Sequence, residues 1–219
     1  MKEHFINELQ RLDSLITAQG RQVEMLIGQA IDAYAAGNIP LARKVVAGDA
    51  AIDSEEIRIE EECLKILALH QPVASDLRTV ASVFKINACL ERIADFGTHI
   101  AERVERMSAC LADPAVEKVD FAPMQYMVLN MLHETVEVID RRDTMKAYSI
   151  IKNDSGVDDC HRCVLESCLQ HLRKAPANAE YYVDCIGISR DLERMADIAT
   201  DICEHIIYQE TGKIIRHQG

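Results

Sequence analysis

Apolar residues recur every three or four positions from the start of the chain, the spacing that places them on one face of an α-helix. The first such stripe consists of Phe5, Leu9, Leu12, Ile16, Val23, Leu26 and Ala30, and only Gln19 interrupts it. Gly37 and Pro40 follow it. They predict the end of this helix and the start of a second one, because Gly suits a helix C-terminus and Pro suits a first turn.

The same spacing continues along the rest of the chain and predicts five more helices. They are expected at about 40–70, 72–113, 124–147, the mid-150s to 174, and 176–212. The segment between Pro114 and Pro123 reads as a linker. No segment alternates with the period of two that strands require, so the prediction is an all-α fold.

The second half of the chain repeats the first. LERIAD at 90–95 recurs as LERMAD at 192–197, an offset of 102 residues. The DxxxD pattern at 49–53 recurs at 154–158, an offset of 105 residues. Shared landmarks in the same order predict a repeat architecture.

We therefore expect two tandem, pseudo-symmetric three-helix bundles, residues 1–115 and residues 116–219. A chain of 219 residues is long enough for one or two domains. Its composition is 48% hydrophobic with only nine Gly and five Pro, a balance that favours long helices over strands and turns.

Charge and cysteine content narrow the partners and the compartment. A net charge of −12 argues against nucleic acid as a partner. The first residues lack the apolar core of a secretory signal, and no run approaches the about 18 apolar residues of a spanning helix. We expect a cytoplasmic protein with no direct membrane insertion and eight reduced cysteines. Cys160 and Cys163 form a lone CxxC, for which packing is the favoured role.

The repeated acids are the candidate functional residues. Two acids four positions apart lie on the same helix face, where their charges repel unless a cation is present. If the second helix of each repeat faces the middle of the third, these acids meet. The predicted metal-binding residues are Asp49, Asp53, Glu91, Asp95 and His99 in the first repeat, and Asp154, Asp158, Glu193, Asp197 and Asp201 in the second.

Carboxylate oxygens suit cations such as Mg, Ca, Mn or Fe. His99 would favour a transition metal in the first repeat, so Fe, Mn, Mg or Zn are the expected cofactors. The alternative is a solvated acidic face, in which Arg92 and Arg194 form salt bridges within their own helices.

Catalysis has little support in the sequence. The chain contains no Gly-rich phosphate loop and no GxSxG motif, and we predict no catalytic residue. Ferritin-like di-iron enzymes use Glu-x-x-His, and the nearest approach here is Asp158 with His161. A metal-storage helical protein and a ferritin-like di-iron enzyme remain the alternatives to a regulator.

These motifs together resemble the phosphate-uptake regulators of the PhoU family, over essentially the whole chain. The resemblance rests on DAAID at 49–53, PVASDLR at 72–78, and the LER motifs at 90–95 and 192–197. It implies two three-helix repeats and a regulator that is not an enzyme.

The resemblance also implies a cytoplasmic accessory of the high-affinity phosphate ABC transporter, which represses the phosphate-starvation response when phosphate is plentiful. Its implied partners are the transporter's ATPase subunit and a membrane sensor histidine kinase. It implies metal at the acidic motifs, and a homodimer is the expected assembly. Candidate partner-binding residues are Asp76, Arg78, Arg92 and Arg194.

Overall fold

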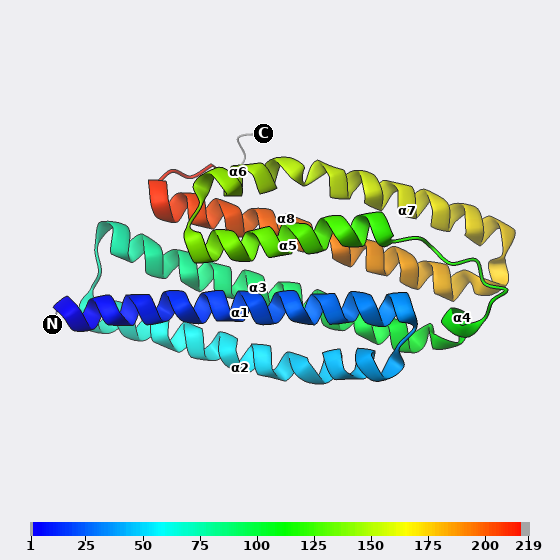
Figure 1. Ribbon diagram of the computed structural model, residues 1–219, viewed down its shortest axis with the longest axis horizontal. Helices are drawn as coiled ribbons and strands as arrows, with labels where there is room; N and C mark the ends of the chain where they lie inside the picture. Colours follow the sequence, from blue (N-terminus) through cyan, green and yellow to red (C-terminus); the bar gives the residue numbers. More distant parts are fainter. Residues whose placement is uncertain (1, 216–219) are drawn as a thin grey trace.

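A computed structural model describes residues 2–215, and helices make up most of this segment (Figure 1). The helices are α1 (Lys2–Ala36), α2 (Ile39–His70), α3 (Ala74–Arg106), α4 (Ser108–Ala112), α5 (Ala122–Arg141), α6 (Thr144–Asn153), α7 (Ser155–Lys174) and α8 (Ala179–Thr211), with a 3-10 turn at Pro176–Asn178. No strand occurs within residues 2–215, so the predicted all-α fold is confirmed. None of the helices described here is long and apolar enough to cross a membrane.

Each half of the chain forms one three-helix unit. In the first repeat, α1, α2 and α3 pack against one another. In the second repeat, α6 and α7 together take the place of α2 (Figure 1). Asp154, which joins them, keeps α-helical backbone angles (φ −56°, ψ −41°). The two helices therefore run on as one helical segment, called the α6–α7 arm below. The two tandem three-helix bundles predicted from the repeats are therefore present.

Two predicted helix ends differ from the structure. The helix expected to run to Ala147 ends at Arg141, because Arg142 adopts a left-handed conformation (φ 54°) and the Asp143 side chain caps the next helix. Its carboxylate accepts a hydrogen bond from the Lys146 backbone N–H at 3.0 Å. The helix expected to run to Asp113 is interrupted at Met107 and continues as the short α4.

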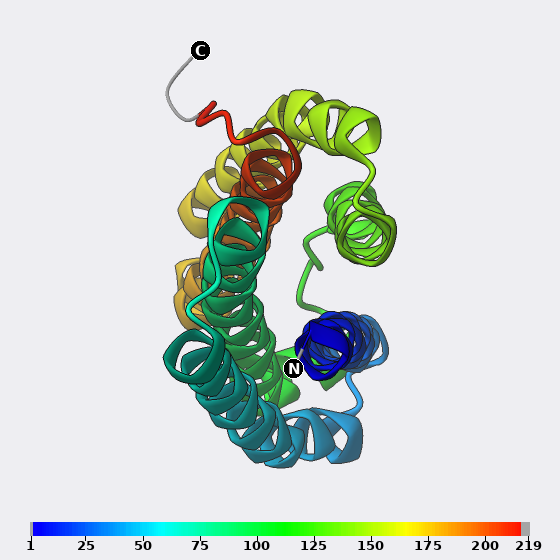
Figure 2. The ribbon, with the colours of Figure 1, turned by 90° about the vertical axis from the view of Figure 1, so that its left-hand side faces the viewer.

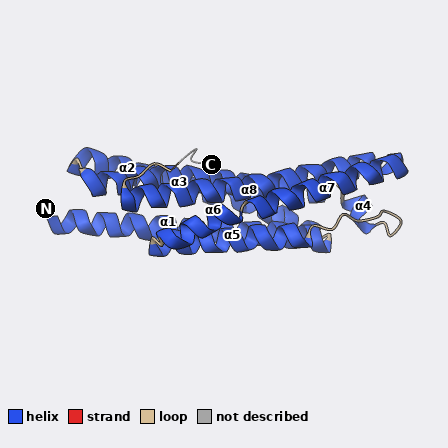
Figure 3. Cartoon of the chain, turned by 90° about the horizontal axis from the view of Figure 1, so that it is seen from above, coloured by secondary structure: helices blue, strands red, loops and turns tan. Residues whose placement is uncertain are grey.

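The helices form two layers. Seen from above, α1 and α5 lie in one layer, and α2, α3, α8 and α7 form the other (Figure 3). The end view shows that this second layer curves around α1 and α5 (Figure 2). The third helices of the two repeats, α3 and α8, pack against each other at the centre, and α1 packs on α5. One hydrophobic core therefore runs through both repeats.

A glycine sets how closely α1 approaches α3. A Cβ atom built on Gly97 would lie 2.5 Å from Ile27 Cδ1 and 2.7 Å from Leu26 Cδ2. Ile27 is fully buried, so it has little room to move away. The close approach of these two helices thus depends on the missing side chain.

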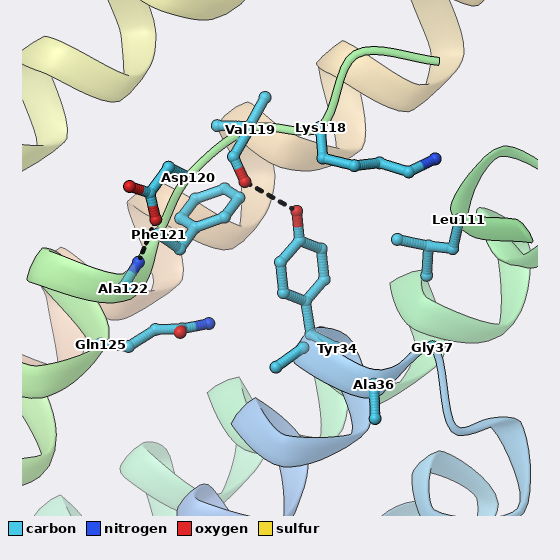
Figure 4. A pocket seen from close by; sticks show the side chains of 11 residues that line it. Tyr34, Ala36, Gly37, Leu111, Lys118, Val119, Asp120, Phe121, Ala122 and Gln125 are labelled. Atoms are coloured by element: carbon cyan, nitrogen blue, oxygen red, sulfur yellow. Dashed lines mark hydrogen bonds between the residues drawn. The ribbon is translucent and has the colours of Figure 1, made fainter. Parts of the chain in front are cut away.

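The linker between the repeats is held by two buried tyrosines. The Tyr34 hydroxyl donates a hydrogen bond to the Val119 carbonyl at 3.5 Å and lies 3.4 Å from the Tyr181 hydroxyl. Figure 4 shows the Tyr34 hydroxyl pointing at Val119 of the linker. Both residues line a cavity of about 310 Å³. The boundary predicted between the two repeats falls in this linker, between Ala112 and Ala122.

Candidate functional site

The first acidic cluster lies where α2 faces α3. Burial raises the pKa of Asp49 above its usual value, and the charges of Asp53 and Asp95 raise it further. Burial also raises the pKa of Glu91, followed by the effect of Asp95. The structure therefore brings these four acids of the first repeat together, because only near neighbours perturb one another in this way.

One carboxylate oxygen in this cluster has no partner among the described residues. Asp49 Oδ1 is buried and accepts no hydrogen bond of ordinary geometry, although the Thr98 hydroxyl lies near enough to lower the pKa of Asp49 somewhat. Leaving a buried acceptor unpaired costs about 1–3 kcal/mol, and a bound cation or a proton would remove this cost. Asp49 is thus the residue at which the first cluster most clearly fits a metal.

Glu56 belongs to the same cluster, although it was not among the predicted residues. Burial raises its pKa, with further contributions from Glu60 and Asp53, and its own charge raises the pKa of Glu91. Glu56 lies three positions after Asp53 and so shares its helix face. Repeat matching missed Glu56 because its counterpart, 105 residues later, is His161.

The second cluster lies between the α6–α7 arm and α8. Burial raises the pKa of Asp154 to about 6, with further increases from Asp197, Asp158 and Glu193. Burial raises the pKa of Asp197 as well, with Glu193, Asp158 and Asp201 as neighbouring charges. The predicted acids of the second repeat are therefore also neighbours in space.

A pair of hydrogen bonds supports the equivalence of the two repeats. In the first repeat, the Asn87 side chain on α3 donates to the Glu56 carbonyl on α2 at 2.8 Å. In the second, the Ser189 hydroxyl on α8 lies 2.7 Å from Nδ1 of His161 on α7. Ser189 follows Asn87 by 102 residues, so the same contact recurs with different side chains.

The CxxC motif lies on α7, and all eight cysteines are free thiols. Cys163 is exposed, while Cys160 is half-buried with its Sγ 3.8 Å from Met127 Sδ. His161, between them, is engaged by Ser189. The packing role predicted for Cys160 agrees with this contact.

Neither cluster is arranged as a metal site as it stands. Within residues 2–215, no three His, Cys, Asp or Glu side chains converge in a geometry that could hold a metal ion. The exposed His99 side chain lies at the edge of the first cluster, with its ring 6.1 Å from that of Phe96. The donor chemistry fits a hard cation, but the carboxylates would have to turn towards it, so metal binding stays a prediction.

The residues predicted to contact partners have different surroundings. Arg78 is half-buried, and its Nε donates to the Gln209 carbonyl near the end of α8 at 3.3 Å. This places a cation at a helix C-terminus, where it is favourable. Asp76 lies in the first turn of α3. Arg92 and Arg194 are exposed, and Arg194 lies 6.0 Å from the centre of the Phe96 ring.

The two repeats also match a known family. The sequence profile of the PhoU domain matches this chain twice, over residues 16–104 and over residues 121–206. The chain belongs to the PhoU family. Each match covers the core of one three-helix unit, so the family resemblance predicted from the motifs is confirmed.

Relatives and solved structures with the PhoU fold cover nearly the whole chain. The phosphate-specific transport system accessory protein PhoU of Edwardsiella tarda is 30% identical, over 98% of this chain and 88% of the relative. The PhoU homologue of Pseudomonas putida is 32% identical, over 100% of this chain and 85% of the relative.

Two crystal structures agree with this fold in detail. PhoU from Pseudomonas aeruginosa aligns with a TM-score of 0.90 at 31% identity, covering 95% of this chain and 100% of the other. The phosphate transport system regulatory protein PhoU from Streptococcus pneumoniae aligns with a TM-score of 0.87 at 28% identity, covering 96% and 99%.

Proposed function

We propose that this chain is an accessory protein of a phosphate-specific transport system that represses the phosphate-starvation response when phosphate is plentiful. The observation that carries this proposal is the PhoU match in both repeats, which spans most of the helical framework. Relatives along its full length bear the name of phosphate-specific transport system accessory protein. These names favour a regulator without a catalytic role over a storage protein or a di-iron enzyme.

Protein contacts would transmit this regulation. The proposed partners are the ATPase subunit of the phosphate ABC transporter and the membrane sensor histidine kinase of the phosphate response, so the chain would act in the cytoplasm. Long helices offer broad faces on which partner proteins can dock. We further propose a homodimer, which light scattering on the purified protein would test.

Metal at the two acidic clusters is the second part of the proposal. Asp49, Asp53, Glu91 and Asp95 would hold it in the first repeat, and Asp154, Asp158, Glu193 and Asp197 in the second. A bound cation supplies charge neutralisation at these surfaces. The raised pKa values of Asp49 and Asp154 support this idea, because burial first, and the neighbouring carboxylates after it, disfavour the charged forms when no counter-ion is present.

The first experiment is a phosphate-starvation reporter, such as alkaline phosphatase activity, in a strain that lacks this gene and grows with abundant phosphate. Deletion should switch the reporter on, and the intact gene should restore repression. A reporter that stays silent after deletion, with no second copy of the gene, would contradict the regulatory role.

A second experiment separates metal from regulation. One variant combines Glu91→Gln, Asp95→Asn, Glu193→Gln and Asp197→Asn. Its matched control removes four exposed charges outside both clusters, through Glu3→Gln, Asp32→Asn, Glu61→Gln and Glu166→Gln. Metal content, partner capture and reporter repression are measured for both. We expect all three to fall in the cluster variant alone. Lost metal with intact repression would show that the clusters are not part of the regulatory surface.

A further inference from the structure

A cavity of about 220 Å³ opens between α3 and α8, at the contact between the two repeats. Arginines dominate its lining, although the chain as a whole has a net charge of −12. They are Arg103 and Arg106 from α3 and Arg190 and Arg194 from α8, with Glu102 and Asp191 as the acids. Such a concentration of guanidinium groups in an acidic protein calls for a physical reason.

Arg103 is held in one orientation by α8. It forms an ion pair with Asp191, and Asp184 Oδ1 lies 3.8 Å from its Nε. Gly187 makes room for this side chain, because a Cβ atom there would lie 2.6 Å from Arg103 Nε. A guanidinium fixed in this way loses little conformational freedom when it binds a ligand.

Of the other three arginines, one is held in an ion pair and two are not. Arg106 is paired with Asp184 at 2.8 Å. Arg190 and Arg194 are exposed and form no salt bridge with residues 2–215, although Arg194 lies near enough to Asp197 to lower the pKa of that carboxyl. Ion pairs within the fold therefore account for Arg103 and Arg106. No ion pair accounts for the exposed Arg190 and Arg194 at the edge of the cavity.

The pseudo-symmetry shows that the arginines are not needed for packing α3 against α8. An offset of 102 residues relates Arg103 to His205 and Arg190 to Ala88. His205 lines a second cavity, of about 180 Å³, together with Lys85. The same helix contact thus exists at both ends, but Arg103 and Arg190 have no arginine as counterpart, whereas Arg194 corresponds to Arg92.

We propose that the cavity between α3 and α8 binds a small tetrahedral oxyanion, with monohydrogen phosphate as its ligand. Guanidinium groups match phosphate oxygens with paired, charge-assisted hydrogen bonds. Arg190 and Arg194 supply positive charge at the exposed edge of the cavity. Arg103, which Asp191 holds in place, supplies an oriented guanidinium group in its lining. The Glu102 carboxylate accepts a hydrogen bond from the P–OH group. Sulfate cannot donate this hydrogen bond, because it carries no proton at the same pH.

This site goes beyond the proposed function, because it requires neither metal nor a partner protein. Phosphate binding can therefore be absent while the regulatory role is correct, and it can be present while the regulatory role is wrong. To keep the two apart, the protein is treated with a chelator before the measurement, so that phosphate cannot bind through a metal at the acidic clusters.

The experiment is calorimetric titration of the full chain at slightly alkaline pH with potassium phosphate, with potassium sulfate in parallel and potassium chloride at equal ionic strength as the blank. Arg190→Gln should weaken phosphate binding about tenfold, the loss of one charge-assisted hydrogen bond. Arg173→Gln, which removes an exposed arginine from α7, outside the lining of the cavity, should leave it unchanged. Circular dichroism melting checks that both variants are folded.

Glu102→Gln tests the assignment of the ligand, because its amide can donate to sulfate as well as accept from phosphate. Intact protein should bind phosphate more tightly than sulfate, and this preference should shrink in Glu102→Gln. Heat no larger than the chloride blank at millimolar phosphate, equal phosphate affinity in Arg190→Gln, or equal affinity for sulfate in the intact protein would each overturn the proposal.

Discussion

Arg103 of the first repeat and Asp191 of the second form an ion pair between the two repeats, and Asp191 is only 2% exposed. The pair joins α3 to α8, the helices that hold the repeats together. A buried carboxylate depends on its counter-ion far more than a surface one does, because water cannot replace the lost partner.

Replacing Arg103 with Met should therefore lower the free energy of unfolding by about 3 kcal/mol, since Asp191 would be left buried and unpaired. Urea denaturation measures this change. The control is Arg43→Met, which breaks an exposed pair with Glu105 and should cost at most about 1 kcal/mol. Equal effects of the two substitutions would mean that Asp191 finds another partner or reaches water.

Gly97→Ala should destabilise the protein by about 1–3 kcal/mol, because the added methyl group meets the buried Ile27 side chain. Gly28→Ala is the matched control, since a Cβ atom there has no neighbour within 4 Å. In the middle of α1 it should stabilise by about 0.5–1 kcal/mol. Opposite signs in urea denaturation are the expected result, and a stabilising Gly97→Ala would contradict the close approach of α1 to α3.

Asp154 should make the protein less stable as pH rises, whereas most carboxylates in folded proteins do the opposite. Its pKa is raised to about 6 in the folded chain, so the folded state binds a proton that the unfolded state has already released. The protein should lose stability from this group as pH rises from about 4 to about 6. Asp154→Asn should accordingly gain about 1 kcal/mol above pH 6, a figure reduced for the partial exposure of this side chain.

The comparison is made by urea denaturation at about pH 4.5 and about pH 7.5, with Asp32→Asn as an exposed control on α1. The difference between Asp154→Asn and the unmodified chain should be clearly larger at the higher pH, because at about pH 4.5 only part of the pH range from about 4 to about 6 has been passed. A difference that is the same at both values would show that the substitution acts through helix capping instead.

The thiols should react in the order of their exposure. Cys163 is exposed, whereas burial raises the pKa of Cys63, Cys185 and Cys203 to about 12. Because the thiolate is the reactive form, Ellman's reagent should modify Cys163 first in the native protein. Cys163→Ser should remove this fast phase, and a fast phase that survives would place an accessible thiol elsewhere in the fold.

Much of the fold followed from local patterns. The 3.6-residue period of apolar side chains identified the long helices, because each helix must bury one face. The repeated DxxxD and LER motifs placed the two acidic clusters, since residues four apart share a helix face whatever the surroundings. The turn at Arg142 was missed because the apolar period continues through it, and Glu56 was missed because its counterpart is His161.

By itself, the sequence determined the helical class, the two repeats, the family and the acidic faces. These properties depend on neighbours along the chain, so spacing alone reveals them. Only the tertiary structure decided that α3 meets α8, that Asp191 is buried against Arg103, and that Arg190 joins them at one cavity. Such residues are nearly ninety positions apart and are brought together by packing of apolar faces, whose relative placement no local period encodes.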